Sequence, residues 1–126
     1  MLKKGEAVFE FTNLPTPYET QVWYETIRTT VSKMEPNAIG YIGWGDLYAY
    51  TYAAWVDLGR TDLRFIEPTP YSKKGGMARS MLEFIRSNMG SRPQYFQWTI
   101  DEVTAAGIQL ETQNVGPTRL FKVTPP

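Results

Sequence analysis

The stretch from Trp44 to Pro68, WGDLYAYTYAAWVDLGRTDLRFIEP, has the most distinctive pattern in the chain. Aromatic and β-branched residues are frequent in it, and such side chains fit a pleated surface that is packed on one side. Tyr48, Tyr50 and Tyr52 occupy alternate positions, which places them on one side of a predicted strand. We therefore expect a half-buried strand that ends at the Phe-Ile-Glu-Pro sequence.

The composition limits what the chain can do. Its length of 126 residues and its hydrophobic fraction of 42% predict a single domain, over residues 1–126, with its own core. Thirteen basic and thirteen acidic residues cancel, so no overall field attracts nucleic acid or an anionic membrane. The absence of cysteine and histidine excludes thiol catalysis, Cys/His zinc sites and Ser-His-Asp triads. No signal peptide or membrane helix is predicted.

Residues 18–34 fit two different structures. Thr16, Pro17 and Glu19 have the pattern of a capped helix start, and apolar residues recur behind them at helical spacing. Against a helix, the run is rich in β-branched residues and contains no alanine or leucine. We favour a strand, which would form a hairpin with a returning strand over residues 39–44.

The second half of the chain contains the clearest helical pattern. Met77, Met81, Leu82 and Ile85 share one side of a predicted amphipathic helix at about 76–90. The other predicted elements are strands over residues 6–12 and 94–98, a short helix over 99–106, and a C-terminal hairpin of residues 108–113 and 118–123. The predicted fold class is therefore α+β. An antiparallel β-sheet packs against one main amphipathic helix, with a short second helix and a C-terminal hairpin.

Two patterns in the chain resemble catalytic or phosphate-binding motifs without completing them. Gly40, Gly43 and Gly45 are not followed by the lysine and the helix start that a phosphate loop requires. Paired carboxylates for acid–base catalysis would have to come from Asp46, Asp57, Asp62, Glu67, Asp101 or Glu102. Nothing in their spacing fixes a catalytic pair, so we expect no catalytic residue, metal or cofactor.

A basic region follows the central stretch. Residues 71–92 contain five basic residues and one acid, and Lys73, Lys74 and Arg79 are the candidates for phosphate contacts. Together with an aromatic strand face, this patch over residues 73–92 would suit a small module that binds single-stranded nucleic acid. Solvated basic side chains and ordinary core aromatics explain the same residues, and the balanced total charge favours that interpretation. The tyrosines equally suit a protein interface, where tyrosine is enriched.

Three segments, in order, resemble the tailed-phage head-tail joining and tail-completion proteins, the small neck proteins of siphophage-type virions. Residues 27–31 (IRTTV) are similar to the Leu-Arg-x-Ser-Ile segment of that family. Residues 52–59 (YAAWVDLG) resemble its Tyr-Ala-x-x-Val-Glu-x-Gly-Thr element with one extra residue, and residues 65–69 (FIEPT) resemble Phe-Leu-x-Pro-Ala. Asp57 replaces the family's glutamate, and Arg60 stands where threonine is usual. The resemblance covers residues 27–89, and it implies a strand over residues 18–34.

The resemblance implies a structural role. The chain would be a ring-forming head-tail connector or tail-completion subunit of a virion, assembled in the host cytoplasm and without catalytic activity. Its partners would be its own copies and neighbouring portal, neck or tail proteins, with DNA passing through the ring without specific binding and no membrane. The candidates for the subunit interface are Trp44, Tyr48, Tyr50, Tyr52 and Arg60. A nucleic-acid-binding module remains the alternative.

Overall fold

The computed structural model describes residues 16–69 and 77–125. The predicted strand over residues 6–12 and the loop residues Lys73 and Lys74 lie outside the described residues. The elements follow one another along the chain as α2 (Pro17–Ser32), β1 (Ile39–Tyr41), α3 (Trp44–Tyr52), η1 (Ala53–Asp57), β2 (Arg64–Ile66), α4 (Arg79–Asn88), β3 (Gln94–Phe96), α5 (Asp101–Ala105), β4 (Leu110–Val115) and β5 (Thr118–Val123).

The fold is α+β, as predicted, but its sheet is mixed. Five strands lie in the order β2-β1-β3-β5-β4. β1 pairs in parallel with β2 and β3, so that Ile39 lies opposite both Arg64 and Gln94. β5 is antiparallel to both of its neighbours. The expectation of a wholly antiparallel sheet is therefore wrong in its parallel half, where helical crossovers connect the strands.

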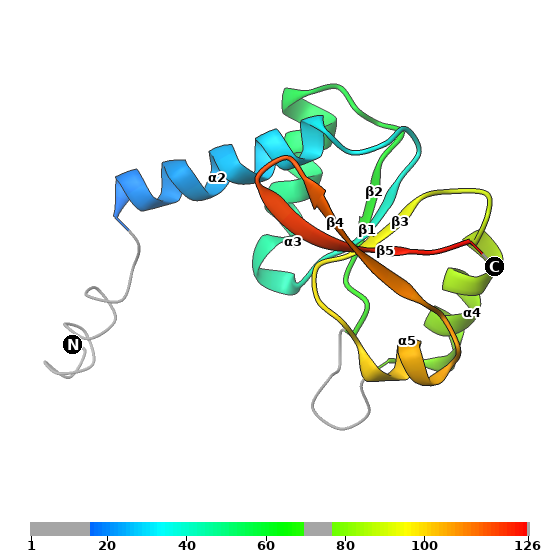
Figure 1. Cartoon of the computed structure of the whole chain (residues 1–126). Coiled ribbons are helices and arrows are strands. Elements are labelled where there is room, and N and C mark those ends of the chain that lie inside the picture. The colour runs from blue at the N-terminus through cyan, green and yellow to red at the C-terminus, as the bar shows by residue number, and fades with distance from the viewer. Residues whose placement is uncertain (1–15, 70–76, 126) are drawn as a thin grey trace, which may run out of the picture.

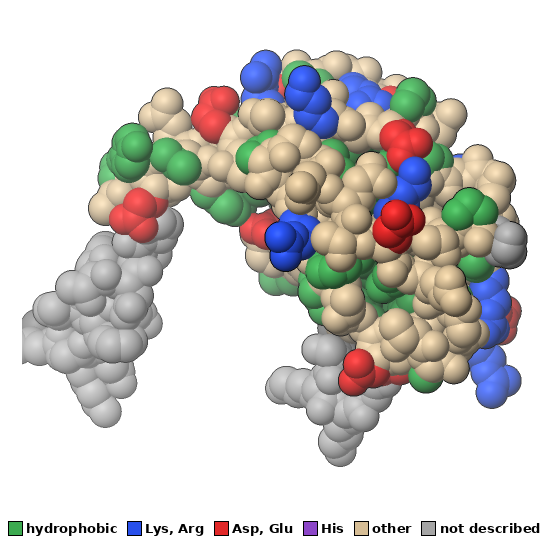
Figure 2. Space-filling view, in the orientation of Figure 1, with side chains coloured by type: hydrophobic (Ala, Val, Ile, Leu, Met, Phe, Trp, Pro, Cys, Tyr) green, Lys and Arg blue, Asp and Glu red, His purple; other side chains and the backbone are tan. Residues whose placement is uncertain are grey.

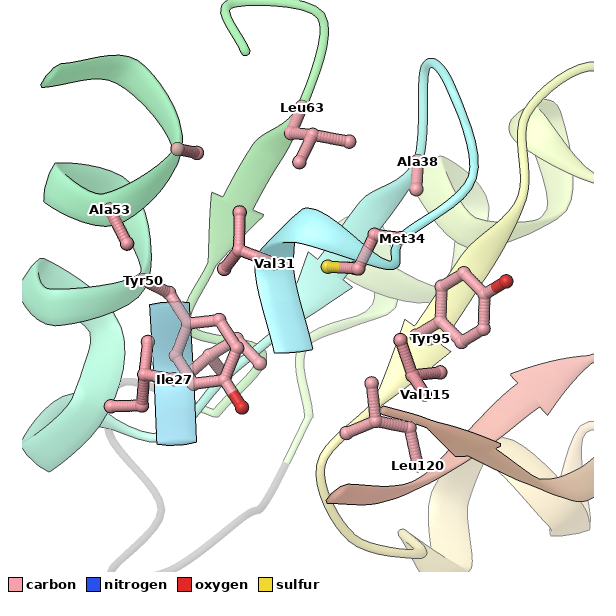
Figure 3. Packing of buried hydrophobic residues seen from close by; sticks show 12 residues of the cluster. Ile27, Val31, Met34, Ala38, Tyr50, Ala53, Leu63, Tyr95, Val115 and Leu120 are labelled. Atoms are coloured by element: carbon pink, nitrogen blue, oxygen red, sulfur yellow. The ribbon is translucent and has the colours of Figure 1, made fainter. Parts of the chain in front are cut away.

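Helices cover both faces of the sheet (Figure 1). α2 and α3 lie on one face, and α4 and α5 lie on the other. The alternation of side chains along β1 produces this division, because Ile39 and Tyr41 point to the α4 side while Ile42 points to the α3 side. The first core joins helix and sheet residues that Figure 3 shows side by side: Ile27, Val31, Tyr50, Ala53, Tyr95 and Leu120.

Residues 17–32 form a helix, so the predicted strand over residues 18–34 and its hairpin are wrong. The Thr16 hydroxyl oxygen accepts a hydrogen bond of 3.1 Å from the Glu19 N–H, which is the cap that the sequence pattern indicated. Among the β-branched residues, Thr26 and Thr30 donate their hydroxyls to carbonyl oxygens one turn earlier, and Ile27 and Val31 are buried. The buried side of the helix decides the structure over local propensity.

The central stretch is also mainly helical, which corrects the strand predicted there. α3 begins after Gly43 and continues into η1, where the Leu58 N–H donates to the carbonyl oxygen of Ala53, five residues earlier. That spacing defines a single wider π-helical turn. Within the stretch, only residues 64–66 form a strand, and Gly59 leaves the helix with φ +63°.

The helices and the hairpin of the second half are confirmed. α4 spans residues 79–88 within the predicted range, and its buried residue is Ile85. The short helix α5 begins with Asp101 and Glu102, as the sequence indicated. β4 and β5 form the C-terminal hairpin around Gly116, whose φ of +58° suits a tight turn.

Candidate interaction surface on helix α3

The outer side of α3 and η1 is apolar, where a solvated helix normally carries polar residues. Five large residues on it are between 51% and 68% exposed, and we call them the aromatic stripe: Trp44, Tyr48, Tyr52, Trp55 and Val56. Steps of three or four residues place them along one side of the helix. The rings of Trp44 and Tyr48 pack edge to face, with centroids 5.3 Å apart.

The inner side of the same helix is packed against the sheet. Tyr50 is 2% exposed, and Ala53 and Ala54 are fully buried. Burial, with the charge of Asp46 nearby, raises the pKa of Tyr50 to about 12. α3 is therefore apolar on two sides, of which the core covers only one.

Hydrogen bonds fix the start of α3 at the end of β1. The Asp46 carboxylate accepts a bond of 2.9 Å from the Trp23 indole N–H and one of 2.7 Å from the Gln97 side-chain amide. The Gln97 amide oxygen in turn accepts from the Gly43 N–H at 2.8 Å. A Cβ at Gly43 would lie 3.2 Å from the Trp98 ring. α2, α3 and the end of β3 are thus held together at one place.

A second set of contacts joins α2 to the other end of the aromatic stripe. The Tyr24 hydroxyl donates to the Asp57 carboxylate, and the Arg28 guanidinium lies 3.8 Å from the same carboxylate. Burial and the bond to Asp57 raise the pKa of Tyr24 to about 12. The rings of Tyr24 and Tyr52 meet edge to face at 6.3 Å. The side chains of the stripe therefore stand on a rigid support.

The first turns of α2 extend away from the body of the protein (Figure 1). We call residues 17–22 the arm. Tyr18 at its start is 74% exposed, and Val22 follows one turn later on the same side. Figure 2 shows hydrophobic side chains gathered on the arm and again on the body below α2. The chain thus presents two separate apolar surfaces to solvent.

Three of the five predicted interface residues lie on this surface. Trp44, Tyr48 and Tyr52 belong to the aromatic stripe, whereas Tyr50 is buried on the opposite side of the helix. The alternating strand that placed Tyr50 beside its neighbours is not present. The sequence analysis did not include Trp55 and Val56 in the interface, although helical steps of three and four residues beyond Tyr52 would have found them.

Arg60, the fifth predicted interface residue, makes intramolecular contacts. Its guanidinium donates to the carbonyl oxygens of Val31 and Met34, at 3.1 and 2.7 Å, and to the Asp62 carboxylate at 3.0 Å. Val31 lies in the last turn of α2 and Met34 lies just beyond its end. Arg60, in the loop after η1, therefore binds the carboxyl-terminal end of α2.

Of the described basic residues in the predicted patch, Arg79 and Arg86 lie away from the aromatic stripe, whereas Arg92 lines a pocket that Trp55 also lines. Arg79 begins α4, on the other face of the sheet from α3. Arg86 donates to the Ala106 carbonyl oxygen at 2.8 Å, and Arg92 to that of Asn37 at 2.7 Å. The predicted aromatic strand face for nucleic acid is absent, because its tyrosines lie on a helix.

Four of the six carboxylates considered for catalysis have structural partners. Asp46 and Asp57 hold α2 to α3, Asp62 binds Arg60, and Glu102 accepts from the Met77 N–H at 3.0 Å. Within residues 16–69 and 77–125, no three acidic side chains gather into a possible metal site.

Every helix in the same part of the chain is too short or too polar to span a bilayer.

Comparison of the chain with models of known protein families, with curated proteins and with solved structures found no match. The resemblance to phage neck proteins therefore stays a prediction. The surface of α3 and α2, rather than a relative, is what suggests a function for this protein.

Proposed function

We propose that this protein is a non-catalytic assembly subunit that binds further copies of itself through the aromatic stripe. The observation that carries the proposal is that α3 is apolar on both its inner and its outer side. Monomeric proteins rarely leave a contiguous apolar surface of this kind in water. Tryptophan and tyrosine are enriched among the interface residues that contribute most to the binding energy.

We take the partner to be a second copy of this chain, because the chain carries two different apolar surfaces. The arm, with Tyr18 and Val22, extends beyond the body of the protein, whereas the aromatic stripe lies on the body. Contact between the arm of one copy and the stripe of the next is head-to-tail, so each copy keeps one free arm and one free stripe. Such heterologous contacts form a ring when the rotation between successive copies closes, and an open filament when it does not.

The rigid support of the stripe favours binding. Bonds from Trp23 and Tyr24 to Asp46 and Asp57 fix α2 against α3 before any partner arrives. Association then orders few additional groups, which reduces its entropic cost. The hydroxyl groups of Tyr48 and Tyr52 supply polar contacts at the rim of an otherwise apolar interface.

Within this proposal, the subunit acts as a ring-forming head-tail connector or tail-completion protein of a tailed phage. The order of the short motifs over residues 27–89 supports that position, next to portal, neck or tail proteins. A net charge of zero suits a ring through which DNA passes without being bound. The helical structure of residues 17–32 departs from the strand that the resemblance implied, so the aromatic stripe is the stronger support.

Light scattering coupled to size-exclusion chromatography tests self-association over a range of concentrations. We expect the wild-type chain to form oligomers, and the stripe variant Trp44→Glu with Tyr48→Glu to remain a monomer. The variant Arg79→Ser with Glu83→Ser is the matched control, because it changes two exposed residues on α4, on the other face of the sheet. A wild-type chain that is monomeric at every concentration would contradict the proposal.

A mixing experiment tests the head-to-tail arrangement. The arm variant, Tyr18→Glu with Val22→Glu, retains its stripe, and the stripe variant retains its arm. Each variant alone should be monomeric, whereas an equimolar mixture should form a heterodimer that cannot extend. If the arm variant alone still assembles, the contact joins equivalent stripes and the ring model is wrong. A mixture that remains monomeric while the wild type assembles would also contradict contact between arm and stripe.

A further inference from the structure

A pocket of about 720 Å³ lies at the amino-terminal ends of the three parallel strands. This volume is within the usual range for small-molecule sites. Its lining comes from the segments before β1 and β3, from the start of β2 and from the last turns of α3 and η1, and it includes Asn37, Trp55, Asp62, Leu63, Arg64 and Arg92. The start of α3, where Trp44 lies, is at the other end of the strands.

The first notable side chain in the pocket is Arg92. Its guanidinium donates to the carbonyl oxygen of Asn37 at 2.7 Å and to that of Asp62 at 3.1 Å. These carbonyl oxygens orient the guanidinium but carry no charge that would balance it. Among the described residues, no carboxylate lies within ion-pair distance of Arg92. A partly buried cation therefore faces the pocket in a fixed orientation.

Arg64 adds a second positive charge. Its guanidinium carbon lies 5.7 Å from the centre of the Phe84 ring, on the α4 side of the sheet, and it too has no ion-pair partner within the described part of the chain. Asp62 also lines the pocket, but its carboxylate accepts from the Asn37 N–H and binds Arg60 at 3.0 Å. These contacts, the first of them foremost, hold the pKa of Asp62 below its usual value. Since Arg60 balances Asp62, the pocket keeps an excess of positive charge.

One wall of the pocket is a flat aromatic surface. The Trp55 indole N–H donates to the Leu63 carbonyl oxygen at 2.9 Å, which fixes the ring, while half of the side chain stays exposed. Tryptophan offers its face to planar rings through stacking, and the planar fork of arginine matches phosphate oxygens. Arg64 on the α4 side of the sheet, Trp55 on the α3 side and Arg92 thus line the same pocket and offer two different kinds of contact.

We propose that this pocket binds an organic phosphate that carries a planar ring, of about the size of a mononucleotide. Arg64 and Arg92 bind the phosphate, and the ring stacks on Trp55. The site does not depend on self-association, since every residue that forms it belongs to one chain. Trp55 is also part of the aromatic stripe, so the bound ligand would lie at the edge of the proposed assembly surface.

Calorimetric titration of the full chain with AMP, adenosine and inorganic phosphate tests the proposal, with tryptophan fluorescence as a second readout. AMP should bind measurably, and adenosine and phosphate should each bind at least about tenfold more weakly, since each makes only one kind of contact. Arg64→Gln and Trp55→Leu should each weaken AMP binding about tenfold or more. Arg64 is exposed, so its variant should fold normally, which circular dichroism checks.

Arg79→Gln is the matched control, because it removes an exposed arginine that does not line the pocket. It should bind AMP as the wild type does, and an equal loss of binding would show non-specific attraction by charge. Phosphate binding as tight as AMP binding, together with an unaffected Trp55→Leu variant, would reduce the site to a simple anion site. The absence of any binding signal with all three probes would contradict the proposal.

Discussion

The indole N–H of Trp23 donates a hydrogen bond of 2.9 Å to the carboxylate of Asp46, and this bond joins α2 to the first turn of α3. The second oxygen of the same carboxylate accepts from Gln97, which follows β3. A single acidic side chain therefore connects three segments that are far apart in the sequence. Both the arm and the aromatic stripe depend on this connection for their positions.

Replacing Asp46 with alanine should destabilise the fold and loosen α2. Loss of two hydrogen bonds to a charged group is expected to cost about 2 kcal/mol. Urea denaturation measures this change, and hydrogen exchange should show faster opening of the first turns of α2. Asp101→Ala is the control: Asp101 also lies in a first helical turn, but its side chain accepts no hydrogen bond from the described residues. Equal losses in the two variants would mean that the contacts of Asp46 contribute nothing beyond its place in the helix.

Two valines on α2 should differ sharply in their contribution to stability. Val31 is fully buried in the core beneath the helix, whereas Val22 lies exposed on the arm. Val31→Ala should lower the free energy of unfolding by about 2 kcal/mol, through lost burial and the cavity that remains. Val22→Ala should change it by less than about 0.5 kcal/mol, measured on the monomer at low concentration. A large loss at Val22 in the monomer would show that the arm packs against its own chain.

Gly40, in the centre of β1, should not tolerate a side chain. A Cβ at this position would lie 2.6 Å from the Phe65 ring of the neighbouring strand. That ring packs at 5.3 Å from Tyr50, so it has little freedom to move aside. Gly40→Ala should therefore cost about 1–3 kcal/mol in thermal or urea unfolding.

A second change in the Gly40→Ala background checks this cause. Phe65→Leu should recover part of the stability, because it removes the atoms in conflict. Gly45→Ala serves as the control, since a Cβ there meets no atom within 4 Å and the position lies in a helix. It should be neutral or stabilising by up to about 1 kcal/mol. A neutral Gly40→Ala would show that β1 and β2 adjust easily.

The stability of the protein should depend on pH through Glu35. Hydrogen bonds from Lys122 and Tyr95 to its carboxylate hold the pKa of Glu35 below its ordinary value of 4.5. The unfolded chain binds the proton more readily, so the carboxylate stabilises the fold above pH 4.5 and this contribution disappears as the pH falls through the lowered pKa. Glu35→Gln should thus be less stable than wild type at pH 7, and this difference should shrink as the pH falls below 4.5.

Chemical denaturation across this pH range measures the difference. Glu83→Gln is the control, because Glu83 is exposed on α4 and has no ion-pair partner among the described residues. It should remain close to wild type throughout. A constant deficit for Glu35→Gln at every pH would attribute its effect to side-chain shape instead of charge.

Elements with a clear local signal could be predicted from the sequence. The apolar residues around Ile85 on α4 recur only at helical spacing, and the turn at Gly116 marks the C-terminal hairpin. Residues 18–34 carried conflicting signals, from the cap at Thr16 and from the β-branched side chains. The cap and the burial of Ile27 and Val31 prevailed, because burial of a whole helix side outweighs small differences in propensity.

The central stretch could not be predicted because its pattern fits two periods. Tyr48, Tyr50 and Tyr52 alternate as in a strand, while Trp44, Tyr48 and Tyr52 also recur every four residues as on a helix. An aromatic residue on the outer side of a helix imitates a core position, so the hydrophobic pattern no longer identifies the buried side. The candidate surface was therefore found in part, at Trp44, Tyr48 and Tyr52, but with the wrong geometry.

The parallel pairing of β1 has a consequence for the order of folding. Ile39 pairs with Arg64 and Gln94, which are distant from it along the chain, whereas β4 and β5 are separated only by a tight turn. Closing long loops before any contact is gained makes parallel pairing slow, and local hairpins form much earlier. We expect pulsed hydrogen exchange during refolding to protect the amides of β4 and β5 before those of β1. β1 is paired on both sides in the finished sheet, yet it should be among the last strands to acquire its neighbours.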